Sequence, residues 1–294
     1  MTQDKIISAV AAGAQVRAFA CTTREMVERC RQIHNSSPVI TAAMGRMLSA
    51  ACMMGSMMKG ERDRLTLQIT GDGPAGTLTV TADSAARVKA CADQYQVIVP
   101  AKPNGKLDVS GAIGAGSLTV IRDLGLKEPY SGSVPLQTGE IAEDLTYYFA
   151  ASEQTPSSVG LGVLMNKDNT VRRAGGFILQ LMPFASDETI ELLEQNLQKI
   201  PSVTEMLEEQ EDPEVMLRRV LEGMEVEITG SRETVYHCDC SRPRLERVLV
   251  SLGEKELGGL IAEGREVEIG CQFCGSQYIF TIPELQHLLK ESRH

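Results

Sequence analysis

Two closely spaced pairs of cysteines near the C-terminus constrain this 294-residue chain more than any other feature. The first pair is Cys238-Asp239-Cys240, and the second follows 30 residues later as Cys271-Gln272-Phe273-Cys274. Two thiolate pairs separated by tens of residues can supply the four corners of a tetrahedral zinc site. The sequence therefore predicts one Zn²⁺ per chain in the reduced state, held by Cys238, Cys240, Cys271 and Cys274.

The residues around the second pair predict two strands joined by a knuckle. Val267-Glu268-Ile269 precedes the pair, Tyr278-Ile279-Phe280 follows it, and Gly275 can adopt the positive φ that such a turn needs. The first pair is unusual, because residues i and i+2 of a flat strand hold their sulfurs too far apart to share one ion. We therefore expect the backbone to turn between Cys238 and Cys240.

The role of this zinc has two interpretations. A closed four-thiolate site has no open coordination position, which disfavours a hydrolytic zinc. A deaminase signature is also missing, since Gly270 rather than proline precedes Cys271. The zinc is then either purely structural or part of a redox switch, in which oxidants attack the thiolates and each pair closes a disulfide that ejects the metal. The short spacing favours the switch, and a small domain at 231–294 would lose its main source of stability with the zinc.

Charge divides the chain into three parts. The net charge is −10, and positions 187–227 carry 13 acidic and 3 basic side chains, whereas positions 1–186 carry 16 acidic and 18 basic ones. This acidic segment has helix-start signals at Ser186, at Ser202 with Glu205, and at Asp212-Pro213. We expect three short helices in an acidic linker at 187–230. It is either a solvated connector or an element whose folding depends on its neighbours, because helices this short and acidic are marginal alone.

The part of the chain before the linker combines helix and strand patterns. Strand-like alternation appears at 65–69, 77–80 and 117–121, and helical patterns appear at 22–33, 39–59, 84–92 and 139–151. The sequence therefore predicts the α+β class: a large mixed domain at 1–186 with β-sheets and packed helices, the helical linker, and the small zinc domain.

Several functions are disfavoured. Gly71-Asp72-Gly73-Pro74-Ala75-Gly76 matches a dinucleotide-binding pattern, but strand alternation follows it, so a hairpin turn is expected. The chain has no P-loop, which gives ATP binding no support. Aromatic residues are sparse at 4%, tryptophan is absent and the charge is acidic, so no nucleic-acid partner is expected.

No membrane partner or export signal is expected. The longest apolar candidate, Met44 to Met58, is interrupted by Arg46. The mildly apolar stretch Ile6 to Val16 lacks the charge pattern of a signal peptide, because Asp4 offsets Lys5.

Other reactive residues have simpler interpretations. The six methionines between 44 and 58 indicate core or subunit-interface packing, with an adaptable apolar surface as the alternative. An acidic cluster lies near the start of the helical pattern at 139–151: Glu140, Glu143 and Asp144. A favourable interaction with the helix dipole explains it more simply than acid–base catalysis does. His34 is the one histidine in the large domain, which leaves a catalytic triad without partners. We expect no catalytic residues and no enzyme activity.

These motifs together resemble a known family. The paired cysteines, Gly139–Phe149 with its Tyr147-Tyr148-Phe149 helix, Ser152-Glu153-Gln154 and the Gly71–Gly76 turn look like the redox-regulated bacterial chaperones of the heat-shock protein 33 family. The resemblance runs over nearly the whole chain in the same order of parts.

The resemblance implies a cytoplasmic, ATP-independent holdase that is inactive when reduced and zinc-bound. On oxidation it implies disulfides Cys238–Cys240 and Cys271–Cys274, release of zinc, a loosened linker and binding of unfolding client proteins, commonly as a homodimer. The remaining thiols lie outside that motif and are expected to be buried and inert: Cys21, Cys30, Cys52 and Cys91. The alternative is a constitutive zinc-ribbon module that docks protein or nucleic acid.

The charge count suggests how such a switch would work. An isolated segment of net −10 without aromatic residues can hardly stay folded alone, so we expect the reduced linker to lie against the large domain and cover apolar surface there. A chain that ends near position 186 is then expected to suppress aggregation without oxidant. The residues expected to face the large domain are Ile190, Leu193, Leu197, Leu207, Val220 and Met224, and Val215 is also expected to point inward from the third helix.

Overall fold

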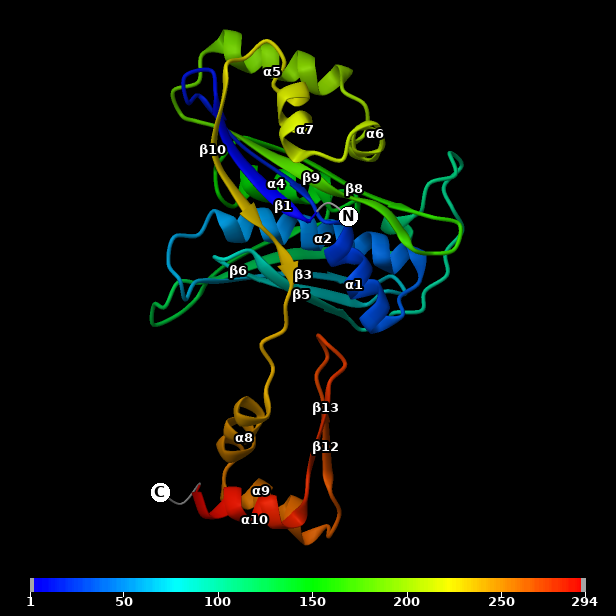
Figure 1. Cartoon of the computed structure of the whole chain (residues 1–294), viewed down its shortest axis with the longest axis vertical. Coiled ribbons are helices and arrows are strands. Elements are labelled where there is room, and N and C mark those ends of the chain that lie inside the picture. Colours follow the sequence, from blue (N-terminus) through cyan, green and yellow to red (C-terminus); the bar gives the residue numbers. More distant parts are fainter. Residues whose placement is uncertain (1–2, 292–294) are drawn as a thin grey trace. The chain divides into compact units, whose positions relative to one another are not determined.

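The computed structural model describes residues 3–291 and divides the chain into two compact units, Met1–His237 and Cys238–His294. The α+β class expected from the sequence is confirmed, and Figure 1 shows the elements. The segment expected to be a linker belongs to the first unit, and the second unit begins at Cys238 rather than at position 231. The difference arises because positions 226–233 form a strand that completes a sheet of the first unit.

That sheet has five antiparallel strands in the order β10-β1-β2-β9-β8. The mildly apolar stretch Ile6 to Val16 forms most of β1 and the turn into β2. The strands are β1 (Lys5–Ala11), β2 (Val16–Thr22), β8 (Ser157–Met165), β9 (Val171–Leu181) and β10 (Val226–Glu233).

The second sheet of this unit has six strands in the order β11-β5-β4-β3-β6-β7, with β11 parallel to β5 and the other pairs antiparallel. The strands expected at 65–69, 77–80 and 117–121 are confirmed as β3, β4 and β6. The bounds are β3 (Arg64–Gly71), β4 (Thr77–Asp83), β5 (Arg87–Ala92), β6 (Gly116–Asp123), β7 (Tyr130–Pro135) and β11 (Val235–Tyr236).

The helix expected at 84–92 is wrong, because most of this stretch is strand β5. The Asp83 carboxylate accepts hydrogen bonds from the backbone N–H groups of Ala85 and Arg87, each at 3.0 Å, and closes a tight turn there. Beyond the turn, Val88 and Ala90 alternate inward and pair with β4. The alternation with a period of two residues therefore decides the structure over the apparent helical pattern.

Three other helices of the large domain are close to those expected at 22–33, 39–59 and 139–151: α1 (Arg24–His34), α2 (Pro38–Ser56) and α4 (Ala142–Ala151). The short helix α3 (Val109–Ile113) was not expected from the sequence. Helix α2 packs against strands of both sheets (Figure 1). It is long and apolar enough to cross a membrane, but 89% of the apolar window is buried inside the protein, as expected of a core helix. Met44, Met47, Met53 and Met54 are buried, which confirms the core interpretation of the methionine run.

The three linker helices are confirmed as α5 (Asp187–Lys199), α6 (Val203–Glu209) and α7 (Pro213–Val220). Their N-termini carry the expected caps: Ser186 accepts from the Thr189 N–H, Ser202 and Glu205 form a capping box, and Asp212 accepts from the Glu214 N–H. Local side-chain chemistry thus fixes where each helix begins.

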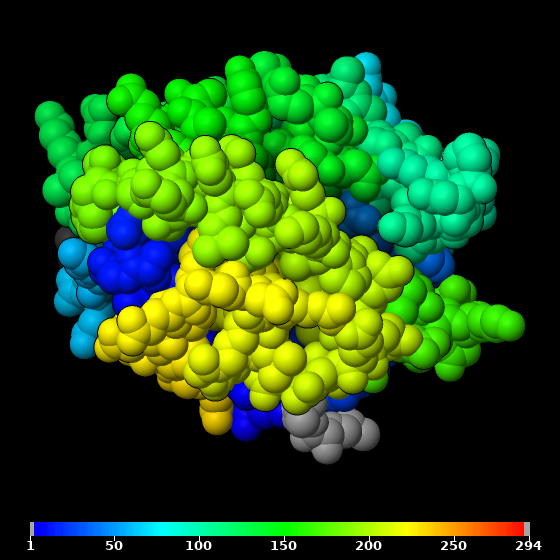
Figure 2. Space-filling model, turned by 90° about the horizontal axis from the view of Figure 1, so that it is seen from above, coloured from blue at the N-terminus to red at the C-terminus, as the bar shows by residue number. Residues whose placement is uncertain are grey.

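These helices cover the outer face of the five-stranded sheet. They form the yellow-green to yellow surface in Figure 2. The strands alternate, so that Ile6 and Phe19 face the main core while their neighbours Ile7 and Ala18 face the linker. The buried residues of this second core are Ile7, Ala9, Ala11, Val16, Ala18, Ala20, Phe177 and Leu179 from the strands, with Leu193, Val203, Met206, Leu207, Met216, Leu217, Val220 and Leu221 from the linker.

Most of the linker residues expected to face inward do so. Leu193, Leu207 and Val220 are buried in this second core, and Leu197 and Met224 pack against it. Val215 does not, since it is 36% exposed. Ile190 is partly buried, but within the described part of the chain it lies outside this core.

The second unit is small. It contains α8 (Arg242–Ser251), α9 (Glu254–Ala262), β12 (Val267–Gly270), β13 (Gln277–Phe280) and α10 (Ile282–Glu291). Its buried apolar residues in the described range are Leu249, Leu257, Phe280, Leu285 and Leu288. A core of this size supplies little hydrophobic stabilisation, so an additional source such as a metal ion is expected.

Candidate metal centre

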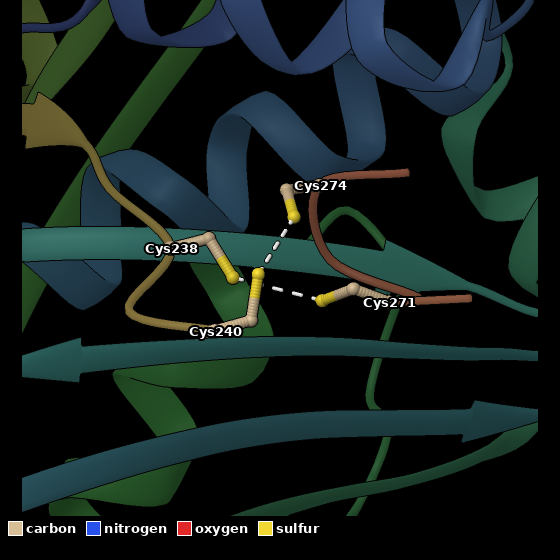
Figure 3. Close-up of side chains that lie close together, drawn as sticks. All are labelled: Cys238, Cys240, Cys271 and Cys274. Carbon is tan, nitrogen blue, oxygen red and sulfur yellow. Dashed lines mark hydrogen bonds between the residues drawn. The ribbon is translucent and has the colours of Figure 1, made fainter. Parts of the chain in front are cut away.

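Two loops of the second unit bring the four predicted cysteines together. Cys238 and Cys240 lie in the segment before α8, and Cys271 and Cys274 lie in the turn between β12 and β13 (Figure 3). The four sulfur atoms all lie within 4.8 Å of one another, and this is the one group of metal-ligating side chains found among residues 3–291.

The sulfur spacing fits a tetrahedral zinc ion. Zinc–sulfur bonds of about 2.3 Å place the sulfurs of a regular tetrahedron about 3.8 Å apart. The Cys238 and Cys271 sulfurs are 3.7 Å apart, and those of Cys240 and Cys274 are 3.1 Å apart. Four converging sulfurs leave no position for water or substrate, so the arrangement suits a structural or releasable metal rather than a hydrolytic one.

The second pair sits on the expected knuckle. Strands β12 and β13 pair in register up to Gly270 and Gln277, and the Gly275 N–H donates to the Cys271 carbonyl at 2.9 Å. Gly275 has φ +69°, a conformation that a residue with a Cβ adopts only with strain. The first pair is not in a strand, and the backbone N–H of Cys240 approaches the Cys238 sulfur. Irregular backbone, not a flat strand, therefore holds the two sulfurs of the Cys-x-Cys pair within 4.8 Å of each other.

The thiols differ in acidity. Burial raises the pKa of Cys238 to about 12, and the nearby sulfurs add to this effect. Burial also opposes ionisation of Cys274, but hydrogen bonds from Ser276 and the neighbouring sulfurs outweigh it and lower its pKa to about 6. Without metal, the readily formed Cys274 thiolate thus lies beside the protonated Cys238 thiol, so binding of zinc to thiolates releases protons.

The other candidate groups are structural. Asp144 accepts from the backbone N–H groups of Gln137, Thr138, Gly139 and Ile141, so it caps α4 and its preceding turn. The Glu140 carboxylate is held by Lys102 and Arg46, and its pKa falls to about 2 because these hydrogen bonds and charges outweigh burial.

The glycine-rich loop is the hairpin turn between β3 and β4, as expected. Its backbone donors are already used: the Gly73 N–H donates to the Ile113 carbonyl at 2.9 Å and the Ala75 N–H to the Ala112 carbonyl at 3.0 Å. A Cβ at Gly71 would lie 1.9 Å from the Ile113 oxygen, so close backbone packing explains this glycine without a nucleotide.

The four scattered thiols are placed as expected of inert cysteines. Cys21, Cys30 and Cys52 are buried and Cys91 is partly buried. Burial raises the pKa of Cys21, and raises that of Cys30 to about 12, which keeps both protonated and weakly nucleophilic.

Comparisons with known proteins assign the family. The sequence model described as Hsp33 protein matches residues 4–281. The chain belongs to the Hsp33 family. It is similar to the 33 kDa chaperonins of Agathobacter rectalis, at 54% identity over 97% of this chain and 99% of the relative, and of Clostridioides difficile, at 50% over 98% and 99%. The crystal structure of the 33 kDa chaperonin from Thermotoga maritima superimposes with a TM-score of 0.89, at 37% identity, covering 99% of both chains.

Membership of the Hsp33 family supports a chaperone function, which is not an enzyme class. The four-cysteine cluster fits zinc binding and redox-sensitive thiols. The family resemblance seen in the sequence is thereby confirmed.

Proposed function

We propose that this protein is a redox-regulated, ATP-independent holdase of the bacterial cytoplasm. Reduced and zinc-bound it is inactive; oxidised, it releases zinc and binds unfolding proteins, as a homodimer, before they aggregate. The observation that carries the proposal is the four-sulfur cluster, which sits in a unit with only a small apolar core. Oxidation of the thiolates removes the ligands and with them the main stabilisation of that unit.

We propose that peroxide is the oxidant. The two zinc-bound thiolates of one pair give two electrons to one H₂O₂, which takes two protons from solvent and becomes two waters, while the two sulfurs form a disulfide. A second H₂O₂ oxidises the other pair in the same way, and Zn²⁺ leaves once its thiolates are consumed. We propose the pairs Cys238–Cys240 and Cys271–Cys274. All six sulfur pairs lie within 4.8 Å in the folded unit, so proximity alone does not select a pairing. Once the unit loosens, however, short loops keep near neighbours together far more than the long loop between the two pairs does, which favours these disulfides.

Release of the linker follows from its connections. The linker reaches Cys238 through β10 and β11, which pair with β1 and β5, and His237 continues this attachment by donating its N–H to the Val88 carbonyl at 2.8 Å. Unfolding of the zinc unit thus begins directly beyond these pairings. Strand β11 has two residues and is the weakest of them, so we propose that it detaches first and that α5–α7 then leave the sheet.

The outer sheet face and the inner faces of the linker helices are apolar and become accessible together in this process. Acidic side chains of the linker keep the open form soluble. The alternative function, a constitutive zinc ribbon that docks a partner, needs no such release and keeps its metal under mild oxidation.

The experiment compares reduced and peroxide-treated protein in two assays. A colorimetric chelator measures zinc released per chain, and light scattering follows aggregation of a chemically denatured client without ATP. We expect about one zinc released per chain together with the onset of aggregation suppression. Retention of zinc with equal activity in both states would support the constitutive ribbon instead.

A further inference from the structure

The linker is held on the sheet by charges as well as by apolar packing. Three acidic residues at the corner between α6 and α7 form ion pairs with four basic residues of the core domain. The pairs are Glu208 with Arg172 and Arg173, Glu211 with Arg24 and Arg173, and Asp212 with Lys5.

The four cations lie at one end of the apolar face. Lys5 begins β1, Arg24 follows the end of β2, and Arg172 and Arg173 lie near the start of β9. These three positions are neighbours in the antiparallel sheet, because Ile6 of β1 pairs with Cys21 of β2, and Thr22 of β2 pairs with Gly175 of β9. The linker itself covers this face in Figure 2.

The contacts are specific in geometry. The Arg172 Nε donates to Glu208 at 2.9 Å, Lys5 lies 3.3 Å from Asp212, and Arg24 lies 3.5 Å from Glu211. Arg173 also donates from Nε to the carbonyl oxygen of Leu207 at 3.0 Å, in the last turn of α6. The cations therefore recognise both acidic side chains and the free carbonyl end of a helix.

The pairs are partly shielded from water. The Arg24 and Glu211 side chains are each 21% exposed, and those of Arg173 and Glu208 are 28% and 27% exposed. Removal of the linker leaves Lys5, Arg172 and Arg173 beside an apolar surface without their acidic partners, whereas Arg24 keeps its ion pair with Glu25 of α1. A segment that binds there has to supply negative charge or leave the cations unpaired, and a basic segment is repelled.

This inference rests on the proposed function. We propose that the sheet face vacated by the linker is a charge-selective client site, which prefers apolar segments that carry acidic residues over the same segments with basic residues. Such segments resemble the linker that occupies the face in the resting state. Clients thus compete with the linker for one surface, and the linker returns when clients leave.

The test uses the full-length oxidised chain and two fluorescent peptides. The first has the sequence of residues 202–221, and the second carries Glu208→Lys, Glu211→Lys and Asp212→Lys, with the same apolar residues. Fluorescence anisotropy measures the binding of each. A partly exposed ion pair gives about a two-fold preference, and the two peptides differ at three acidic positions. We therefore expect the acidic peptide to bind about ten-fold tighter at low salt. The difference is expected to shrink as ionic strength rises.

Two variants of the chain localise the effect. Arg172→Gln with Arg173→Gln is expected to remove most of the preference, whereas Lys127→Gln, which changes an exposed cation of the β6–β7 loop, keeps it. Circular dichroism of each oxidised variant checks that the core domain remains folded.

The outcomes separate this inference from the proposed function. An oxidised chain that suppresses client aggregation but binds both peptides equally, or prefers the basic one, overturns the charge selectivity and leaves the holdase function standing. Equal preference in the double-arginine variant and in the Lys127→Gln control also overturns it. An oxidised chain that neither suppresses aggregation nor binds either peptide refutes both.

Discussion

Substitution of Leu207 by alanine tests whether linker docking keeps the protein inactive. Leu207 is fully buried in the apolar layer between α6 and the sheet. Its Cδ1 atom lies 3.2 Å from the position that a Cβ would occupy at Gly175, so the leucine packs over a glycine that has no side chain of its own. Alanine leaves this space empty, because the backbone of β9 cannot move outward to fill it.

A buried leucine-to-alanine change costs about 3 kcal/mol, from lost burial and from the cavity that remains. In the open state Leu207 is exposed, so nearly all of this cost falls on the docked linker. At about 1.4 kcal/mol per ten-fold change, the population with an open linker rises on the order of 100-fold. We expect reduced, zinc-loaded Leu207→Ala protein to suppress client aggregation in part without oxidant.

The assay combines light scattering with hydrogen exchange of reduced protein. Amides of α5–α7 should lose protection, while α2 keeps its protection and the zinc content stays at the wild-type value. Val215→Ala is the matched control, since Val215 lies in α7 but is 36% exposed and its truncation costs little. If Leu207→Ala exchanges and behaves like the control, linker docking does not keep the protein inactive.

Three further predictions concern the cysteines and the buried carboxyl group of Asp4. Cys271→Ser exchanges a soft thiolate for a poor ligand, so metal analysis should find little zinc in the reduced variant, and full retention would refute the ligand assignment. Peptide mapping of peroxide-treated protein should find Cys238–Cys240 and Cys271–Cys274, and mainly long-range bridges would contradict the proposed pairing. Asp4 is 4% exposed, and burial raises its pKa from 3.8 to about 6, so its contribution to folding is favourable below pH 3.8 and is lost as the pH rises through 6. Asp4→Asn should therefore stabilise the protein at pH 7 by up to about 3 kcal/mol, with the gain vanishing near pH 4, and thermal unfolding across this range checks the sign.

The convergence of the four cysteines was predictable because its signal is chemical and local. Four cysteines in two close pairs have few alternatives to a shared metal, so the long separation between the pairs did not matter. The starts of the linker helices were predictable for a similar reason, since Ser202 and Glu205 satisfy each other's backbone groups within one turn.

Features that depend on distant partners could not be predicted. Helix and strand patterns are both short at 84–92, and the deciding contacts come from β4 and from the turn closed by Asp83. Val215 matched an inward spacing, but α7 is anchored by Met216, Leu217 and Val220, which turns Val215 toward solvent. Strand β10 lies at the edge of the sheet and pairs with β1 on one side. Its sequence therefore shows a weak alternation of apolar and polar residues.

Strand β10 also affects how one tests whether the folded zinc unit keeps the linker docked on the sheet. A chain that ends near position 186 loses β10, so the edge of β1 is left unpaired and can itself bind other chains. It also loses Thr234, whose N–H and hydroxyl donate to the carbonyls of Asp4 and Ala86. Suppression of aggregation by that chain would therefore not show that uncovering the linker face is responsible.

A chain that ends after His237 separates the two effects, because it keeps α5–α7, β10 and β11 and removes only the second unit. If the folded zinc unit latches the linker, this chain should suppress aggregation without oxidant, with faster exchange in α5–α7 than in β1 and β2. The short helices α6 and α7 depend on docking for their stability, so even modest loosening should be visible. If the shortened chain stays protected and inert, but becomes active on adding Leu207→Ala, the linker's own contacts hold it closed. In that case loss of the folded zinc unit is not enough to release the linker. The oxidised, unfolded unit would instead have to detach β11 from β5 actively.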